Sequence, residues 1–440
     1  MRLRAAEVAD AVGGTCAGPD VEIAGASIDS RTLLPGALFV PVRAERDGHD
    51  FIDDAIVAGA AAYLTARVVA AVGGNATAIA VEDTEAALLR LAAWARARLT
   101  DRVVGITGSS GKTTTKDLLA AALATIYRAA ASERSFNNEL GVPLTVLNAA
   151  DDVEAVIVEM GARERGHIRR VCDVARPSVG IVTNVSAAHT ELFGGVDGVA
   201  VAKGELVEAL PAGGVAVLNA DDVRVAAMAS RASARVLTFG DAGDVRAGDV
   251  RLDDELRPSF TLHSPWGSAS ARLSVLGRHQ VANALAAAAA ALALDVPLAS
   301  VAEALARAQP ADWRMQLVRA PSGVLVMNDS YNANPASTEA ALRALTALGA
   351  RRRVAVLGPM LELGALSDAE HARIGQLAVE LGIDEVITVG APAYGVGFDV
   401  GDIATALERL GTLTAGDAVL VKASRAAGLE KLAAELAGAA

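Results

Sequence analysis

Residues 108–114 have the composition of a phosphate-binding loop. The stretch follows the apolar, β-rich run 103–107 and leads into a helical segment. Glycines let backbone N–H groups approach phosphate oxygens, and the N-terminus of the next helix adds about half a positive charge. Lysine supplies a point charge for the terminal phosphates, and the hydroxyl after it can bind Mg²⁺. The predicted nucleotide site comprises Gly108, Ser109, Ser110, Gly111, Lys112, Thr113 and Thr114.

This loop departs from the strict pattern G-x-x-x-x-G-K-[ST], which requires glycine where the chain has Ile106. A glycine-rich turn with a surface lysine is therefore the competing interpretation. The flanking strand and helix favour nucleotide binding, because both are needed to direct the backbone N–H groups toward one ligand.

Three titratable residues come next along the chain. Glu159 ends the apolar run 155–159, and an acid at the end of a parallel strand beside a phosphate loop suits a Mg²⁺ ligand. His189 follows the next strand, so contact with metal or phosphate and a structural role are equally supported. Lys203 has, by its own chemistry, the character of an ordinary solvated lysine.

Polar residues also gather at later strand and helix boundaries. Asn283 is the odd polar residue on an alanine-rich helix, and its amide could pair with an adenine edge. Asp329 could accept from ribose hydroxyls, and Tyr331 could cover a base. Asn334 precedes a proline and fits a helix N-cap, which is compatible with a binding role. Lys422, Ser424 and Arg425 follow the last strand, where they would suit a carboxylate.

Two polar clusters lie near the N-terminus. Asp29-Ser30-Arg31 and Asp47-Gly48-His49 flank predicted turns. Arginine and serine beside a turn can bind a phosphate or a base edge. From chemistry alone, solvated loop residues are the simpler interpretation.

The apolar pattern predicts an α/β protein of three domains, in line with a length of 440 residues. Residues 1–100 read as a smaller α/β unit. Within 101–312, apolar strands alternate with helices, which predicts a mostly parallel sheet covered on both faces, followed by an antiparallel hairpin around 264–267. Residues 313–440 contain four further strands alternating with helices and predict a doubly wound α/β unit.

Composition excludes several classes of protein. A net charge of −12 argues against general binding to nucleic acid or acidic membranes. The longest apolar run, 281–294, is shorter than the roughly 20 residues that span a bilayer, and the N-terminus has no apolar signal segment. The two cysteines give no disulfide framework and fit a reducing cytoplasm. Nothing in the sequence requires a protein partner, so we expect a monomer.

Together these segments resemble the Mur ligase family over essentially the whole chain. The resemblance rests on DSRTLLPGALFVPVRAERDGHDF, TGSSGKTTTK, SFNNELGVPLT, VEMGARERGHI, NVSAAH, AKGE, GRHQVANALAA, NDSYNANPAS, GPMLELG and VLVKASR. It implies a UDP-sugar-binding domain, a central ATPase domain and a Rossmann-like domain that closes on it. It also implies ATP-driven joining of D-alanyl-D-alanine to UDP-N-acetylmuramoyl-tripeptide through an acyl phosphate, in cytoplasmic peptidoglycan precursor synthesis.

The resemblance assigns roles to individual residues. The catalytic set is Lys112, Glu159, His189 and Lys203. Mg²⁺ ions would be held by Thr113, Glu159, His189 and Lys203, the lysine being carbamoylated by CO₂. Besides the loop, ATP would meet Asn283, Arg314, Asp329 and Tyr331. The substrates would meet Ser30, Arg31, His49, Asn137, Asn138, Asn332, Asn334, Ser424 and Arg425.

Two departures and two alternatives accompany this resemblance. The family more often has asparagine at Gln280 and aspartate at Asn328, so details of the nucleotide contact differ here. A sister amide ligase is disfavoured by the segments NDSYNANPAS and GPMLELG. A GTPase-like switch would need a base-reading N-K-x-D loop, which the sequence lacks.

Overall fold

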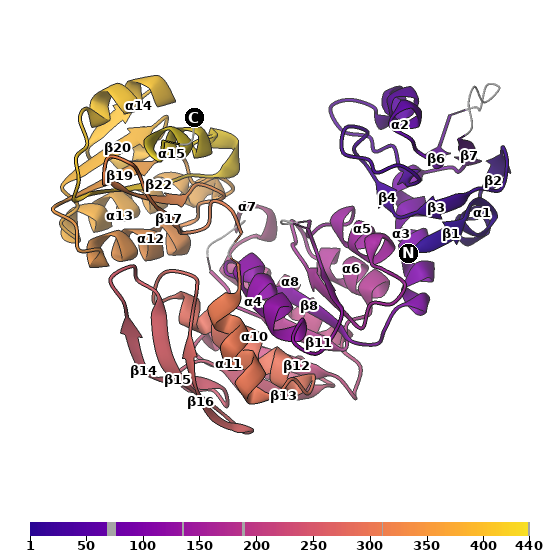
Figure 1. Ribbon diagram of the computed structural model, residues 1–440, viewed down its shortest axis with the longest axis horizontal. Coiled ribbons are helices and arrows are strands. Elements are labelled where there is room, and N and C mark those ends of the chain that lie inside the picture. The colour runs from indigo at the N-terminus through magenta and orange to yellow at the C-terminus, as the bar shows by residue number, and fades with distance from the viewer. Residues whose placement is uncertain (68–75, 134–135, 187–189, 310, 439–440) are drawn as a thin grey trace.

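The middle of the chain is built around a six-stranded parallel sheet (Figure 1). The computed structural model describes residues 1–67, 76–133, 136–186, 190–309 and 311–438. In spatial order the strands are β13 (Arg235–Phe239), β12 (Val215–Asn219), β11 (Val179–Val182), β8 (Val103–Thr107), β10 (Ala155–Glu159) and β9 (Ala129–Ala131). All neighbouring strands pair in parallel, which confirms the predicted sheet. β9 was not predicted, because three alanines carry little strand preference.

Both faces of this sheet are covered by helices. The residues of β10 up to Val158 are all apolar because alternate side chains enter the cores on opposite faces. Ala155 and Ile157 enter one core, whereas Val156 and Val158 enter the core on the other face. The first core contains α4 (Lys112–Leu123), α10 (Gln280–Ala293) and α11 (Leu298–Arg307). The second contains α5 (Gly141–Asn148), α6 (His167–Ala175) and α8 (Val196–Ala209). The alanine-rich α10 is therefore a buried core helix, as expected.

The predicted hairpin is confirmed as part of a separate three-stranded antiparallel sheet. Its strands are β14 (Arg246–Leu252), β15 (Pro258–Ser264) and β16 (Gly267–Arg272). Helix α11 packs against β16 and joins this sheet to the larger core. Short helices α7 (Thr190–Phe193) and α9 (Val223–Ala227) complete the middle of the chain.

The N-terminal part forms a smaller α/β unit. Its five-stranded sheet has the order β2 (Thr15–Ala17), β7 (Thr77–Ala80), β6 (Ala62–Thr65), β5 (Leu38–Phe39) and β4 (Ala26–Ser27), and β1 (Arg2–Arg4) pairs with β3 (Glu22–Ala24). The helices are α1 (Ala5–Val12), α2 (Ile52–Val57) and α3 (Thr84–Ala95). Asp83 caps α3 by accepting from the backbone N–H groups of Glu85 and Ala86. Because α3 packs on α5 and α6, this unit shares one apolar core with the central sheet.

The C-terminal part contains a second six-stranded sheet. Its order is β17 (Gln316–Arg319), β18 (Leu325–Asp329), β22 (Asp417–Lys422), β19 (Arg352–Leu357), β20 (Glu385–Val389) and β21 (Phe398–Val400). All pairs are parallel except that of β17 with β18. The helices are α12 (Pro335–Ala347), α13 (Ser367–Glu380), α14 (Ile403–Leu410) and α15 (Glu430–Leu436). Asn334 caps α12 by accepting from the N–H of Ser337, as its position before Pro335 predicted.

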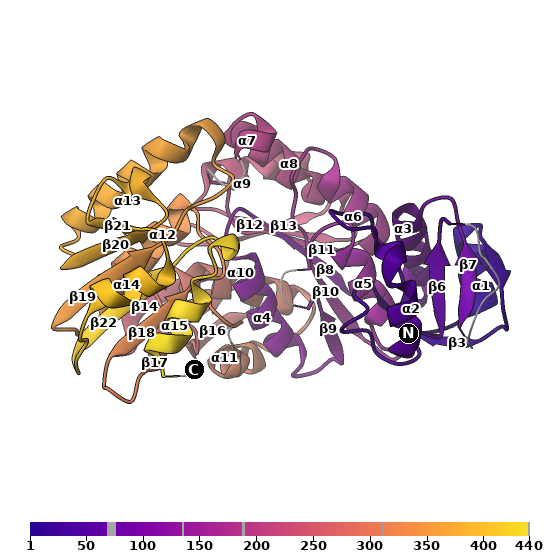
Figure 2. The ribbon, with the colours of Figure 1, turned by 90° about the horizontal axis from the view of Figure 1, so that it is seen from above.

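The three parts lie in a row, with the N-terminal and C-terminal units on opposite sides of the central sheet (Figure 2). Short 3₁₀ turns lie at Gly48–Phe51, Arg96–Arg98, Met228–Arg231, Gly364–Leu366, Pro392–Tyr394 and Arg425–Ala427. Among the described residues, no helix is long and apolar enough to cross a membrane.

Arg96 ties the N-terminal unit to the central one. Its buried Nε donates to the carbonyl oxygen of Ala175 at 2.6 Å, and Nη2 donates to that of Arg176 at 3.3 Å. Arg96→Met leaves these carbonyls at the end of α6 without the guanidinium. We expect a loss of roughly 1–3 kcal/mol in the free energy of unfolding, measured by denaturant titration. Arg90→Met, at an exposed position of α3, is the control and should leave the denaturant concentration at the midpoint of unfolding unchanged.

Candidate active site

A cavity of about 920 Å³ is lined by the phosphate-loop residues, strand-end residues of the central sheet and residues of the C-terminal unit. Strands β8, β10 and β11 are neighbours, so the residues at their carboxyl ends reach the same edge of the sheet. Ligands of open parallel α/β sheets bind at this edge. Ile28 is the contribution of the N-terminal unit to the lining.

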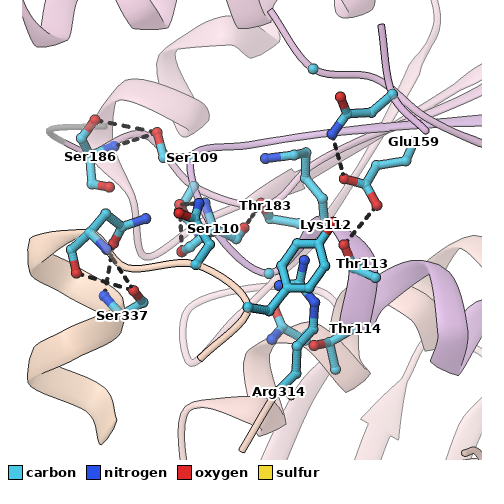
Figure 3. Close-up of a pocket in the computed structure, with 18 of the residues that line it drawn as sticks. Ser109, Ser110, Lys112, Thr113, Thr114, Glu159, Thr183, Ser186, Arg314 and Ser337 are labelled. Atoms are coloured by element: carbon cyan, nitrogen blue, oxygen red, sulfur yellow. Dashed lines mark hydrogen bonds between the residues drawn. The ribbon is translucent and has the colours of Figure 1, made fainter. Parts of the chain in front are cut away.

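The phosphate loop is held by the segment that follows β11. The backbone N–H of Ser110 donates to Oδ1 of Asn184 at 3.0 Å, and Oγ1 of Thr183 donates to the Ser110 carbonyl oxygen at 2.6 Å (Figure 3). Gly111 has φ +79°, and a Cβ there would lie 2.2 Å from Oδ1 of Asn283. Only glycine allows both this conformation and this close approach.

Glu159 lies beside the loop and is held through both of its oxygens. Thr113 Oγ1 donates to Glu159 Oε2 at 2.8 Å, and Asn137 Nδ2 donates to Glu159 Oε1 at 2.9 Å (Figure 3). The side chain is almost completely buried. These two bonds fix the carboxylate and leave it next to the threonine hydroxyl, so that two oxygen ligands of the kind Mg²⁺ prefers are adjacent.

Two lysines share the same buried region. Burial lowers the pKa of Lys112, and the nearby Glu159 carboxylate opposes that shift. Burial and the charge of Lys112 lower the pKa of Lys203 well below its ordinary value. Lys112 Nζ donates to the Gly108 carbonyl oxygen at 2.7 Å, which holds the ammonium over the loop. The Lys203 amine is therefore more readily neutral than that of a solvated lysine.

His189 lies outside the described residues. Within the described part of the chain, no three His, Cys, Asp or Glu side chains cluster as a metal site. Mg²⁺ in nucleotide enzymes is held by one or two protein ligands together with phosphates and waters. Thr113 and Glu159 fit that requirement.

The opposite wall of the cavity comes from the C-terminal unit. Asp329 is bound by Lys422 Nζ and accepts from the backbone N–H of Met315 at 3.0 Å. Lys422 Nζ also donates to the carbonyl oxygen of Asn332 at 3.0 Å, so it orders the loop after β18. The Arg314 guanidinium lies 4.3 Å from the centre of the Tyr331 ring. Arginine and aromatic ring thus form a stacked surface facing the phosphate loop.

His279 precedes α10 and also lines the cavity. Burial lowers its pKa to about 4, partly offset by the charge of Asp329. The imidazole is therefore neutral at physiological pH and can both donate and accept a hydrogen bond.

The structure brings most of the predicted residues together. Besides residues 109–114 of the loop, the cavity lining contains Asn137, Asn138, Glu159, Lys203, Asn283, Arg314, Asp329, Tyr331, Asn332, Asn334 and Arg425; Gly108 is not part of it. Two of them also have structural partners. Asn283 Nδ2 donates to Oε1 of Gln280 at 2.6 Å, and Asn334 caps α12.

Four predicted substrate residues are not in the cavity lining: Ser30, Arg31, His49 and Ser424. The ring of His49 is buried; Nδ1 lies 2.7 Å from Asp47 Oδ1, and Nε2 accepts from the N–H of Ala66. Arg31 is exposed and paired with Asp29. Ser424 is buried, and its Oγ accepts from the N–H of Leu361 at 3.0 Å. His49 and Ser424 each have a structural partner outside the cavity lining, so their predicted substrate contacts stay predictions.

Four residues of the site were missed as site residues: Thr183, Asn184, His279 and Lys422. Thr183 and Asn184 directly follow β11, so the strand-end rule applied to Glu159 would also have found them. Lys422 was noted at its strand end, but its ion pair joins residues that are 93 positions apart. No local pattern in the sequence identifies that partner.

Comparisons with known proteins identify the family of the chain. Family models match residues 22–96 (Mur ligase family, catalytic domain), 106–291 (Mur ligase middle domain) and 313–425 (Mur ligase, glutamate ligase domain). The chain is 42% identical to the UDP-N-acetylmuramoyl-tripeptide–D-alanyl-D-alanine ligase of Mycobacterium tuberculosis, covering 98% of this chain and 97% of the relative. It is 36% identical to the Escherichia coli enzyme of the same name, covering 97% and 96%.

Solved structures give the same result. The crystal structure I of MurF from Acinetobacter baumannii matches with a TM-score of 0.90 and 32% identity over 100% of this chain and 99% of the other. The MurF ligase of Thermotoga maritima, solved in complex with ADP, matches with a TM-score of 0.82 and 28% identity, covering 94% and 97%.

Gly111→Ala tests the phosphate loop. The positive φ alone costs a residue with a Cβ about 1–2 kcal/mol, and the Cβ would also displace Asn283. We expect the Kd for ATP to rise roughly tenfold or more, as about 1.4 kcal/mol corresponds to a factor of ten. Titration with a fluorescent nucleotide measures this. Gly213→Ala, where an added Cβ would meet nothing within 4 Å, is the control, and equal ATP affinity in both variants would contradict the prediction.

Proposed function

The chain belongs to the Mur ligase family, and we propose that it joins D-alanyl-D-alanine to UDP-N-acetylmuramoyl-tripeptide with hydrolysis of ATP to ADP and phosphate. One observation carries this proposal. The phosphate loop and Glu159 lie on one side of a single cavity, and Asp329 and Arg314 lie on its opposite wall. ATP use is supported by the matching MurF ligase that was solved with ADP.

We assign one part of substrate binding to each of three domains. Residues 1–100 would bind the UDP-sugar, residues 101–312 would bind ATP and hold the reacting carboxylate, and residues 313–440 would bring the dipeptide. The separate sheets support these boundaries. Because ATP and a UDP-linked substrate are both consumed, the reaction belongs in the cytoplasm, and a monomer contains all the site residues named above.

The reaction begins with two anions that repel each other. A carboxylate oxygen of the tripeptide attacks the γ-phosphorus of ATP; the bond from that phosphorus to the bridging oxygen breaks, and ADP leaves. The product is an acyl phosphate, whose carbonyl carbon is now open to attack. The amine of the dipeptide then adds, loses a proton, and expels inorganic phosphate to form the amide. Lys112 and the loop N–H groups stabilise the γ-phosphate during the first step.

The residues suited to Mg²⁺ are Thr113 and Glu159, joined in our proposal by His189 and Lys203. When bound, Mg²⁺ neutralises phosphate charge and aligns the reacting oxygens. Lys203 contributes only as a carbamate: its neutral amine attacks CO₂, a C–N bond forms, and one proton is released. The lowered pKa of Lys203 supports this step, because only the neutral amine is nucleophilic.

The remaining cavity residues would bind the substrates. Asn283 and Tyr331 would contact the nucleotide base, Asp329 the ribose, and Arg314 the phosphates. Asn137 and Asn138 would lie along the tripeptide, with Asn332, Asn334 and Arg425 on the dipeptide side. Ser30 and Arg31, which do not line this cavity, stay proposals for the UDP end.

The decisive test is phosphate release with ATP and Mg²⁺. We expect full release only when UDP-N-acetylmuramoyl-tripeptide and D-alanyl-D-alanine are both present, and mass spectrometry should show the joined product. Release that ignores the dipeptide, or that requires a single amino acid instead, would contradict the proposed function.

Lys203→Ala tests the carbamate. We expect the rate of ligation to fall roughly 100-fold or more, because the variant lacks the amine that forms the proposed carbamate ligand of Mg²⁺. Added bicarbonate should not restore the rate. With ¹³C-bicarbonate, NMR should detect a carbamate carbon in the unaltered protein and none in the variant. Lys431→Ala, at an exposed position of α15, is the control. Full activity of Lys203→Ala would remove this hypothesis.

A further inference from the structure

Arg314 lies in the segment that joins α11 to β17, and the C-terminal unit fixes its backbone on both sides. The carbonyl oxygen of Trp313 accepts from the N–H of Tyr331 at 3.2 Å. The N–H of Met315 donates to Oδ1 of Asp329 at 3.0 Å. Trp313 and Met315 have φ of +59° and +51°, in the left-handed region that non-glycine residues seldom occupy. Such strain persists only where the surrounding structure imposes it, so the segment holds the Arg314 side chain in a defined direction.

The guanidinium of Arg314 carries a donor that nothing satisfies. Its Nε is buried and has no hydrogen-bond partner in the part of the chain that the structure describes. The guanidinium instead stacks on the ring of Tyr331, whose centre lies 4.3 Å away. A buried N–H group without an acceptor costs free energy. This face of Arg314 is therefore complementary to an acceptor that another element supplies.

A carboxylate oxygen in the same condition lies on α4. Asp117 comes one helical turn after Thr113 and Thr114, so the three side chains lie on the same side of the helix. Both threonines line the cavity. Oδ1 of Asp117 lies 3.3 Å from Nζ of Lys116, whereas Oδ2 is buried and has no hydrogen-bond partner among the described residues. Helix α4 thus carries a free acceptor one turn from the phosphate loop.

The charges of Arg314 and α4 already influence each other. Burial raises the pKa of Asp117, and the charges of Lys116 and Arg314 oppose that shift. Burial also lowers the pKa of Lys112, and Arg314 adds to that effect. Figure 3 shows Arg314 reaching into the cavity toward the loop that carries Lys112. Because no ion pair joins Asp117 to Arg314 in the described part of the chain, the central and C-terminal units must approach slightly for the two to meet.

We propose that Asp117 is a positioning residue for Arg314: when the substrates are bound, the two units approach and Asp117 Oδ2 accepts a hydrogen bond from the Arg314 guanidinium. This inference rests on the proposed function, in which Arg314 contacts the phosphates of ATP. A guanidinium has five N–H donors in a planar fork, so Nε pairs with the carboxylate while the terminal N–H groups bind phosphate. The pair satisfies two buried atoms at once and aligns the guanidinium with the reacting phosphate.

The first test compares kcat with nucleotide affinity in Asp117→Asn. Arg314 is then no longer aligned by a charge, so we expect kcat to fall roughly tenfold or more, which corresponds to the loss of one charged hydrogen bond. The Kd for ATP alone should stay within about twofold, because the pair forms only in the complete complex. Asp173→Asn, at an exposed position of α6, is the control. An unchanged kcat in Asp117→Asn would overturn the proposal.

A double-mutant cycle separates positioning from a structural effect. Arg314→Met removes the guanidinium, so in that background Asp117→Asn should lower kcat by less than about twofold. An equal fall in kcat with and without the guanidinium means that Asp117 acts through the fold, and that result overturns the proposal.

A crystal structure of the unaltered enzyme tests the contact without relying on the folding of a variant. The ligands are a non-hydrolysable ATP analogue and UDP-N-acetylmuramoyl-tripeptide. We expect Asp117 Oδ2 within about 3.2 Å of a guanidinium nitrogen of Arg314, and a separation beyond about 4 Å contradicts the pairing. If the unaltered enzyme releases no phosphate with both substrates, the proposed function fails instead, and the distance between these two side chains is still measured.

Discussion

The buried charges around Glu159 are the constraint on which the rest of the site depends. Lys112 and Lys203 lie in the same region, and burial lowers the pKa of both amines. A buried ammonium is costly unless a negative group lies near it. Glu159 supplies that charge to Lys112, and the hydrogen bonds from Thr113 and Asn137 keep the carboxylate in place. The region beside Lys112 is therefore suited to hold phosphates, whose negative charge further compensates the buried Lys112 ammonium.

The phosphate loop and the strand-end carboxylate were predictable because both follow from local pattern. A glycine pair followed by lysine and threonine gives the loop, and the end of an apolar run gives Glu159. The departure at Ile106 did not matter, since the residue is buried in β8 and the loop geometry depends on Gly108 and Gly111. The family resemblance is confirmed by relatives that cover nearly the whole chain.

Other features depend on contacts between distant segments, which a single sequence does not reveal. His49 looked available for a ligand, but its ring is enclosed by Asp47 and the backbone of Ala66. Ser424 looked like a substrate residue, but its hydroxyl accepts from the backbone N–H of Leu361. In both cases a polar side chain beside a turn had the chemistry of a binding residue, and only the tertiary fold shows that it also holds the backbone.

The two sides of the cavity differ in how firmly they are joined to the central sheet. The N-terminal unit shares a continuous apolar core with it through α3, α5 and α6. The C-terminal unit meets the central part through a smaller apolar contact in which Leu256 and Leu276 join Met315. Because hydrophobic stabilisation scales with buried apolar area, displacing the C-terminal unit costs less than displacing the N-terminal one. The wall that carries Asp329, Glu362 and Arg425 is thus joined to the central sheet by less apolar contact than the N-terminal unit is, whereas the phosphate loop and Glu159 belong to the central sheet itself.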